Sequence, residues 1–178
     1  RVKTDWDDYL LLAVFNLDKS ARREKLSAGL LGLDSARSYR IYDFWNEEYA
    51  GCFRGEFAPE IPADSCKLYR ISRTRKHPWL LSTNMHIQQG NVEVTALKWN
   101  PRAMTLSGRV TRPRGERGSL YFIMPNNYML VNHEHHWLMK VGTDNSVVIR
   151  RDFEFTKKEM PFDLKFSPLP ANARVNNY

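Results

Sequence analysis

The feature that most constrains this chain is a strand signal that repeats along its whole length. Short runs rich in Val, Ile, Phe, Tyr and Trp recur about every ten residues, with Gly, Pro, Asn and Asp between them. This spacing predicts an all-β fold built from antiparallel β-sandwiches, Greek-key or jelly-roll-like in connectivity. The expected strands are 9–16, 25–29, 39–45, 51–57, 66–72, 79–86, 92–99, 103–110, 119–124, 136–141, 146–153 and 162–166.

Turn signals refine this pattern. The alternation over 92–96 predicts a strand, and its change of register near Leu97 indicates a bulge. Asn-Pro-Arg at 100–102 predicts a hairpin, because proline fixes φ and donates no backbone hydrogen bond. One proline and two glycines within 112–118 predict a second hairpin. Residues 21–31 hold good helix formers, but interrupting glycines favour strand or turn there.

A charged run that ends in proline, residues 73–78, separates two groups of strands. We therefore predict a β-sandwich over 1–75, a second β-sandwich region over 76–170 and a flexible tail over 171–178. The first group of strands would bury itself poorly alone. Two sandwiches packed together and one continuous sandwich both remain open.

Composition and charge bear on possible partners. A hydrophobic share of 42% is ordinary for a folded domain. The formal net charge of +7 is concentrated in 70–77 and 109–117, which lie at expected strand ends or turns, so solvated loops are favoured over nucleic-acid binding. The longest apolar run, 9–15, is shorter than the roughly 20 residues that span a bilayer. We expect neither a nucleic-acid nor a membrane partner.

Because the chain begins at Arg1 without methionine, we expect an internal piece of a longer protein.

The thiol and imidazole side chains suggest few special sites. Cys52 and Cys66 lie on expected neighbouring strands, where either a disulfide or a pair of buried free thiols fits. His133 and His135 would point the same way in an extended segment, which makes them weak metal candidates. No cysteine or acidic partner accompanies them at the spacing of a zinc motif. We therefore predict no metal site and no cofactor.

Glycosidic hydrolysis needs paired carboxylates. The candidates are Asp43 with Glu47 or Glu48, and Asp152 with Glu154, because residues two apart on a strand share a face. Like charges on an exposed strand face are far commoner than catalytic pairs, so we predict no catalytic residues.

Exposed aromatic side chains are the usual platforms for sugar rings. Most tryptophans at alternating strand positions are expected in the core. Trp137, Tyr128 and Asn127, expected in loops, are therefore the candidate carbohydrate-binding residues. The available platforms are Trp45, Trp79, Trp99, Trp137, Tyr49 and Tyr128.

Four segments carry a resemblance to a known family. Tyr-Arg-Ile-Tyr-Asp-Phe-Trp at 39–45, followed by a turn and strand at 61–71 that begin with Ile-Pro-Ala-Asp-Ser, resembles the C-terminal β-domain of alpha-galactosidase-like (melibiase-like) glycoside hydrolases. Ala-Val-Phe-Asn-Leu at 13–17 resembles the opening strand of that domain. Residues 80–90 resemble, more loosely, the continuation seen in larger bacterial relatives.

In such hydrolases, two acidic residues on a (β/α)-barrel perform the chemistry, and a barrel needs roughly 250 residues with alternating helices and strands. This chain offers neither. The resemblance therefore implies a non-catalytic C-terminal accessory region of a bacterial glycoside hydrolase, periplasmic or extracellular, that packs against or stabilises a catalytic barrel supplied upstream. A surface hydrophobic patch would support this. The alternative is a carbohydrate-binding module that holds an oligosaccharide through exposed aromatics.

Overall fold

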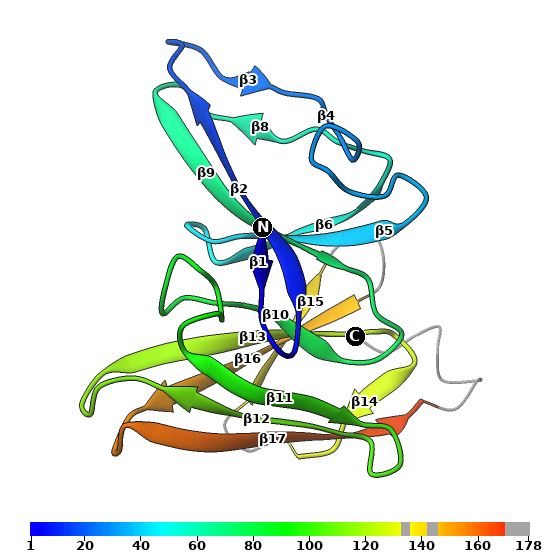
Figure 1. The fold of residues 1–178 in the computed structure, drawn as a ribbon, viewed down its shortest axis with the longest axis vertical. Coiled ribbons are helices and arrows are strands. Elements are labelled where there is room, and N and C mark those ends of the chain that lie inside the picture. The colour runs from blue at the N-terminus through cyan, green and yellow to red at the C-terminus, as the bar shows by residue number, and fades with distance from the viewer. Residues whose placement is uncertain (133–135, 142–145, 170–178) are drawn as a thin grey trace. The chain divides into compact units, whose positions relative to one another are not determined.

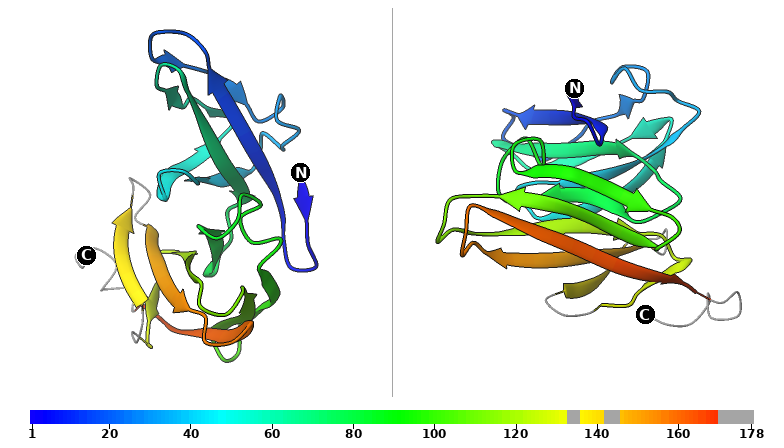
Figure 2. Two further views of the ribbon diagram at one scale, coloured as in Figure 1. Left: turned by 90° about the vertical axis from the view of Figure 1, so that its left-hand side faces the viewer. Right: turned by 60° about the horizontal axis from the view of Figure 1, so that its bottom comes forward.

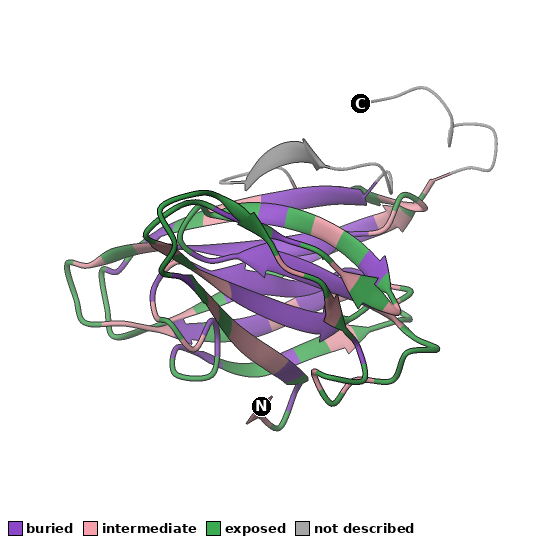
Figure 3. Cartoon of the chain, turned by 90° about the horizontal axis from the view of Figure 1, so that it is seen from above, coloured by how far each residue is buried: buried purple, intermediate pink, exposed green. Residues whose placement is uncertain are grey.

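The structure, a computed structural model, describes residues 1–132, 136–141 and 146–169, with the backbone alone for 136–141. All regular structure in these ranges is β-strand, joined in antiparallel ladders, so the predicted all-β class is confirmed. The search of these residues finds no helix long and apolar enough to cross a membrane. Figure 3 shows buried residues along the strands and mostly exposed residues in the loops.

The backbone forms two compact units. The first consists of Arg1–Val2 and Asp8–Thr74, and the second consists of Lys3–Asp7 together with the chain from Arg75 onward. The predicted boundary near residue 75 stays a prediction, but the short segment Lys3–Asp7 was not anticipated as part of the second unit.

The first unit is built on a five-stranded sheet and two short ribbons (Figure 1). The sheet has the order β1 (Val2–Lys3), β2 (Asp8–Asn16), β9 (Ser65–Arg73), β5 (Ser38–Asp43) and β6 (Glu48–Arg54). The ribbons pair β3 (Arg22–Arg23) with β8 (Glu60–Ile61), and β4 (Leu26–Ser27) with β7 (Glu56–Phe57).

The core of the first unit lies on one face of this sheet. Tyr69 and Ile71 of β9 are buried in it, and Leu10, Leu12 and Val14 of β2 pack against it. Side chains of the ribbons and of the loop between β4 and β5 complete the core, because Ala28, Leu31, Leu33, Phe57 and Ile61 pack in the same cluster. The sheet therefore buries one face within its own unit.

The second unit contains two four-stranded sheets, which can be followed in Figures 1 and 2. One has the order β10 (Trp79–Thr83), β13 (Arg117–Met124), β16 (Ser146–Glu154) and β15 (His136–Val141). The other has the order β11 (Val94–Asn100), β12 (Thr105–Thr111), β17 (Glu159–Pro168) and β14 (Tyr128–Leu130).

Aromatic rings from both sheets form the core of the second unit. The ring of Phe122 on β13 lies 5.6 Å from that of Phe162 on β17, and the ring of Phe153 on β16 lies 6.3 Å from Phe162. Gly108 of β12 lies within a regular ladder, opposite Phe162. A β-carbon there would stand 2.7 Å from the Cζ of Phe162, so glycine gives the ring its space.

One predicted hairpin and the predicted bulge are confirmed, and the other predicted hairpin is wrong. The hairpin at 100–102 is confirmed, since Asn100 pairs with Thr105 across β11 and β12. The bulge near Leu97 is confirmed by a register shift between Thr95 and Lys98. The second hairpin, at 112–118, is wrong: β12 and β13 belong to different sheets, so this loop carries the chain from one sheet to the other.

Both cysteines are free and exposed, so the disulfide and the buried thiol pair are both wrong. Cys52 stands opposite Arg40 on β5, and Arg40 stands opposite Ser72 on β9. Cys66 lies on β9 six positions before Ser72. At about 3.3 Å per residue, the two cysteines are roughly 20 Å apart, beyond the reach of a disulfide.

The segment Lys3–Asp7 is fixed by hydrogen bonds within the second unit. The indole nitrogen of Trp6 donates to the carbonyl of Val94 at 3.1 Å. The carboxylate of Asp7 accepts from Arg75 at 2.6 Å and from the indole nitrogen of Trp79 at 3.1 Å. The Arg75 guanidinium also lies over the Trp79 ring, 4.3 Å from its centroid. Asp7 thus connects two neighbouring side chains of the second unit.

His77 lies between two tryptophans of the second unit. Its ring stacks on Trp99 at 5.1 Å and contacts Trp79 edge-on at 5.4 Å. Burial lowers the pKa of His77 below its ordinary value of 6.5, while the hydrogen bond to the Pro78 carbonyl opposes the shift and the charge of Arg75 reinforces it. The folded protein therefore holds His77 neutral more firmly than the unfolded chain does.

This environment predicts a pH dependence of stability. Below about pH 6.5 the unfolded chain binds the His77 proton more readily than the folded chain, so stability falls as the pH drops through this region. His77→Gln should reduce that fall in urea unfolding compared between pH 7.5 and 5.5, conditions set around the ordinary pKa. His86→Gln is the control, and an equal reduction by both substitutions would contradict the assignment to His77.

Candidate docking face

The first unit carries an exposed apolar surface on the face of its large sheet opposite the core. Side chains alternate between the two faces of a strand. Because Leu10, Leu12 and Val14 pack on the core side, Leu11 and Phe15 belong to the other face. We call that side the outer face.

The register of β2 and β9 extends this surface across two strands. Ala13 stands opposite Leu68, and Phe15 stands opposite Cys66. We call Leu11, Ala13, Phe15, Cys66 and Leu68 the outer apolar row. Phe15, the last residue but one of β2, is 68% exposed, a large value for a phenylalanine in a paired strand. The row contains no charged side chain, so water covers it at a free-energy cost.

The turn after β5 carries another exposed aromatic side chain of the first unit. The backbone nitrogen of Phe44 donates to the carbonyl of Leu68 at 2.8 Å. The ring of Trp45 contacts that of Phe44 edge-on, with centroids 4.9 Å apart. Trp45 is 55% exposed, so it differs from the core position expected of a strand tryptophan.

The remainder of the outer face is buried and polar. The guanidinium of Arg70 lies 3.8 Å from the centre of the Tyr9 ring, a close cation–π contact. Arg40 donates to the Tyr49 hydroxyl at 2.6 Å. These contacts fix the strands that hold the outer apolar row.

Asp43, one of the candidate carboxylates, is held by neighbouring side chains of the first unit. Asp43 is buried and forms an ion pair with Lys67 at 2.9 Å, and it accepts a hydrogen bond from Asn46 at 2.8 Å. A carboxylate held in this way is a structural anchor. The described residues contain no group of three or more His, Cys, Asp or Glu side chains that could hold a metal ion.

The predicted carbohydrate-binding residues all belong to the second unit. Tyr128 is half-buried, and its ring contacts those of Trp99 at 5.8 Å and Phe166 at 6.3 Å. The Asn127 carbonyl accepts a hydrogen bond from the Leu169 backbone at 2.9 Å. Tyr128 therefore packs against other aromatic rings of its own unit.

The expected loop positions of Trp137 and Tyr128 are wrong, because Tyr128 begins β14 and Trp137 lies in β15, opposite Arg150 of β16. The side chain of Trp137 is outside the described part of the structure. His133 and His135 also lie outside the described residues, as does the predicted tail. Sugar binding by Trp137, Tyr128 and Asn127 stays a prediction.

Sequence reasoning placed Phe15 on a strand but did not identify its exposure. The run from 9 to 15 is apolar at odd and even positions alike, so alternation could not distinguish the inner face from the outer. The resemblance supplied the only available signal, because it implied a domain that packs against another.

Comparison with known proteins bears on this unit. Residues 2–71 match the family described as the alpha galactosidase C-terminal beta sandwich domain, which confirms the resemblance over the first unit. No curated protein and no solved structure matches the chain. A domain of the matched kind is non-catalytic by itself, and it belongs to larger glycoside hydrolase chains.

Proposed function

We propose that this chain is the C-terminal accessory region of an alpha-galactosidase-like glycoside hydrolase, and that its first unit docks on the catalytic domain through the outer apolar row. The observation that carries the proposal is the exposure of Phe15 within the segment that matches the family. Two further exposed apolar side chains, Leu17 and Trp45, belong to the same unit. Its role is structural, and the chemistry belongs to the partner domain.

The energetics favour such a partner. Fully burying a phenylalanine side chain contributes about 1.5–3 kcal/mol relative to leaving it in water. Contiguous apolar surface on a folded domain commonly marks an interface. Because the row has no charge of its own, we infer that the matching surface of the catalytic domain is also apolar.

The proposal also predicts what precedes the chain. In the parent enzyme, the part of the chain that precedes this region should fold as a (β/α)-barrel whose paired acidic residues cleave the glycosidic bond. The resemblance of residues 80–90 to larger bacterial relatives supports a bacterial parent enzyme, periplasmic or extracellular.

Phe15→Asp is expected to weaken docking at least tenfold, because it puts a charge into an apolar contact. The measurement is the dissociation constant between this chain and the upstream catalytic domain, expressed separately and titrated in a calorimeter. Leu30→Asp is the matched control, since Leu30 is 73% exposed in the same unit but lies in the loop after β4, away from the outer apolar row.

Equal losses for the two variants would contradict docking through the row. A failure of the two wild-type parts to associate at micromolar concentrations would refute the proposal itself. Circular dichroism of each variant establishes that the sheet is intact.

A further inference from the structure

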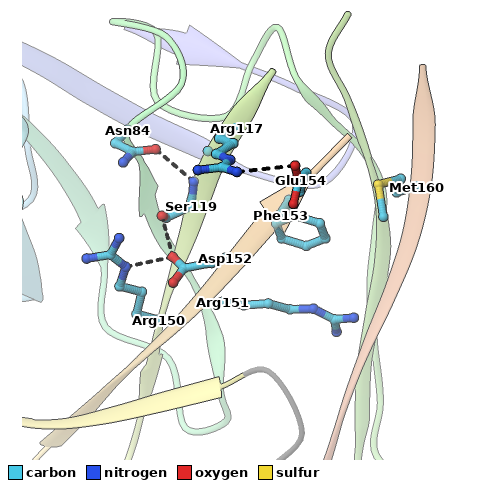
Figure 4. A pocket seen from close by; sticks show the side chains of 10 residues that line it. Asn84, Arg117, Ser119, Arg150, Arg151, Asp152, Phe153, Glu154 and Met160 are labelled. Carbon is cyan, nitrogen blue, oxygen red and sulfur yellow. Dashed lines mark hydrogen bonds and ion pairs between the residues drawn. The ribbon is translucent and has the colours of Figure 1, made fainter. Parts of the chain in front are cut away.

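A polar pocket lies in the second unit, outside the segment that matches the family (Figure 4). Its volume is about 720 Å³, within the range of small-molecule sites. It forms around neighbouring parts of β13 and β16. Its lining residues are Asn84, Arg117, Gly118, Ser119, Arg150, Arg151, Asp152, Phe153, Glu154 and Met160.

The ladder between β13 and β16 arranges charged and polar groups in rows. Arg117 stands opposite Glu154, and Ser119 stands opposite Asp152. Successive rows on one face are about 7 Å apart, because they are separated by two residues along each strand. Each carboxylate of β16 therefore faces a donor of β13, and Figure 4 shows the contacts Arg117–Glu154 and Ser119–Asp152 as dashed lines.

Asp152 is held in place before any ligand arrives. Its Oδ1 accepts from the Ser119 hydroxyl at 2.6 Å and from the Nε of Arg150 at 2.7 Å. Ser119 is itself buried, and its backbone nitrogen donates to the Asn84 side chain at 2.8 Å. This support gives the carboxylate a fixed orientation, which lowers the entropic cost of binding.

A second carboxylate with a similar partner lies one row away. Arg117 donates to the Oε1 of Glu154 at 3.3 Å. Asp152 and Glu154 were considered above as a carboxylate pair, and each is now seen beside an arginine. They are thus suited to accept hydrogen bonds, while the neighbouring guanidinium groups donate them.

The charge balance indicates which ligand fits. A phosphate or a carboxylate would have to compete with Asp152 and Glu154 for Arg150 and Arg117. The third lining arginine, Arg151, already donates to the backbone carbonyl of Asp163 at 3.0 Å. A cation would compete with Arg150 and Arg117. A hydroxyl group both donates and accepts, so a compound with several adjacent hydroxyls can use both members of each pair without a net charge. Phe153 adds apolar surface to the lining.

We propose that this pocket binds a neutral oligosaccharide, with sugar hydroxyls hydrogen-bonded to Asp152, Glu154, Arg117 and Arg150. The site lies in a different unit from the outer apolar row and uses none of its residues. It would give the accessory region a saccharide-binding function in addition to docking.

Affinity gel electrophoresis of the whole chain tests the proposal. Gels contain galactomannan or xyloglucan as neutral probes, or polygalacturonate as an acidic probe. We expect retardation by a neutral polysaccharide, and a loss of about tenfold or more in affinity on Glu154→Gln or Asp152→Ala, because each removes an ionised acceptor.

The control is Glu159→Gln, which alters another exposed pair between strands: Arg109 lies 3.1 Å from Glu159 in the other sheet of the unit. It should leave retardation unchanged. Migration unaffected by either neutral probe would overturn the proposal, as would retardation by polygalacturonate alone or equal losses in all three variants. Phe15→Asp should leave this binding intact, so failure here and failure of docking remain distinguishable.

Discussion

Asp7→Ala is expected to lower the free energy of unfolding of the second unit by about 3 kcal/mol, because removing one partner of a buried ion pair leaves the other groups without their acceptor. The side chain of Asp7 is only 3% exposed, and that of Arg75 is 32% exposed. The substitution removes the acceptor of Arg75 and that of the Trp79 indole nitrogen together. Because Arg75 is partly exposed, the expected loss of unfolding free energy lies at the lower end of the range for breaking a buried ion pair.

Tryptophan fluorescence during urea unfolding measures this effect. The chain has five tryptophans, of which only Trp45 belongs to the first unit. In a Trp45→Phe background, emission therefore reports the second unit. Asp5→Ala is the matched control, since Asp5 is exposed in the same segment. A difference between the two variants below about 1 kcal/mol would contradict the role given to Asp7.

Gly108→Val is expected to destabilise the second unit by about 3 kcal/mol, the upper part of the range for overpacked cores. Even the first side-chain carbon would stand 2.7 Å from the ring of Phe162. That ring lies close to those of Phe122 and Phe153, which limit its movement. The Cα of Leu97, 3.4 Å from the same position, limits movement on another side.

A double-mutant cycle tests this explanation with the same fluorescence assay. Phe162→Leu removes the ring that a side chain at 108 would meet. The double variant should therefore be more stable than the sum of the two single effects predicts, by about 1 kcal/mol or more. Strict additivity would show that the substitution acts through something other than the ring of Phe162.

Much of the fold could be predicted because strand runs and turn residues are local signals. The bulge beside Leu97 and the hairpin at 100–102 depend on neighbouring residues and were predicted correctly. The loop at 112–118 was not, since a proline and two glycines permit a hairpin and a crossing between sheets equally well. Only packing over the whole unit decides between them, which is a non-local property.

The candidate sites were harder to predict, for the same reason. Phe15 and Leu10 have similar side chains on one strand, and their opposite environments depend on which face the ribbons cover. The pocket depends on a pairing between Ser119 and Asp152, 33 residues apart, that no local pattern encodes. Its two carboxylates were noted in the sequence, but their arginine and serine partners became visible only in the ladder.

The placement of Lys3–Asp7 in the second unit limits how the gene can recombine during evolution. A recombination event that joined the segment from Arg75 onward to another gene would leave Trp6 and Asp7 behind. The transferred unit would then lack the carboxylate that Arg75 and Trp79 share. We therefore expect related proteins that contain the second unit to contain the segment before β2 as well. The two units should accordingly occur together in one chain.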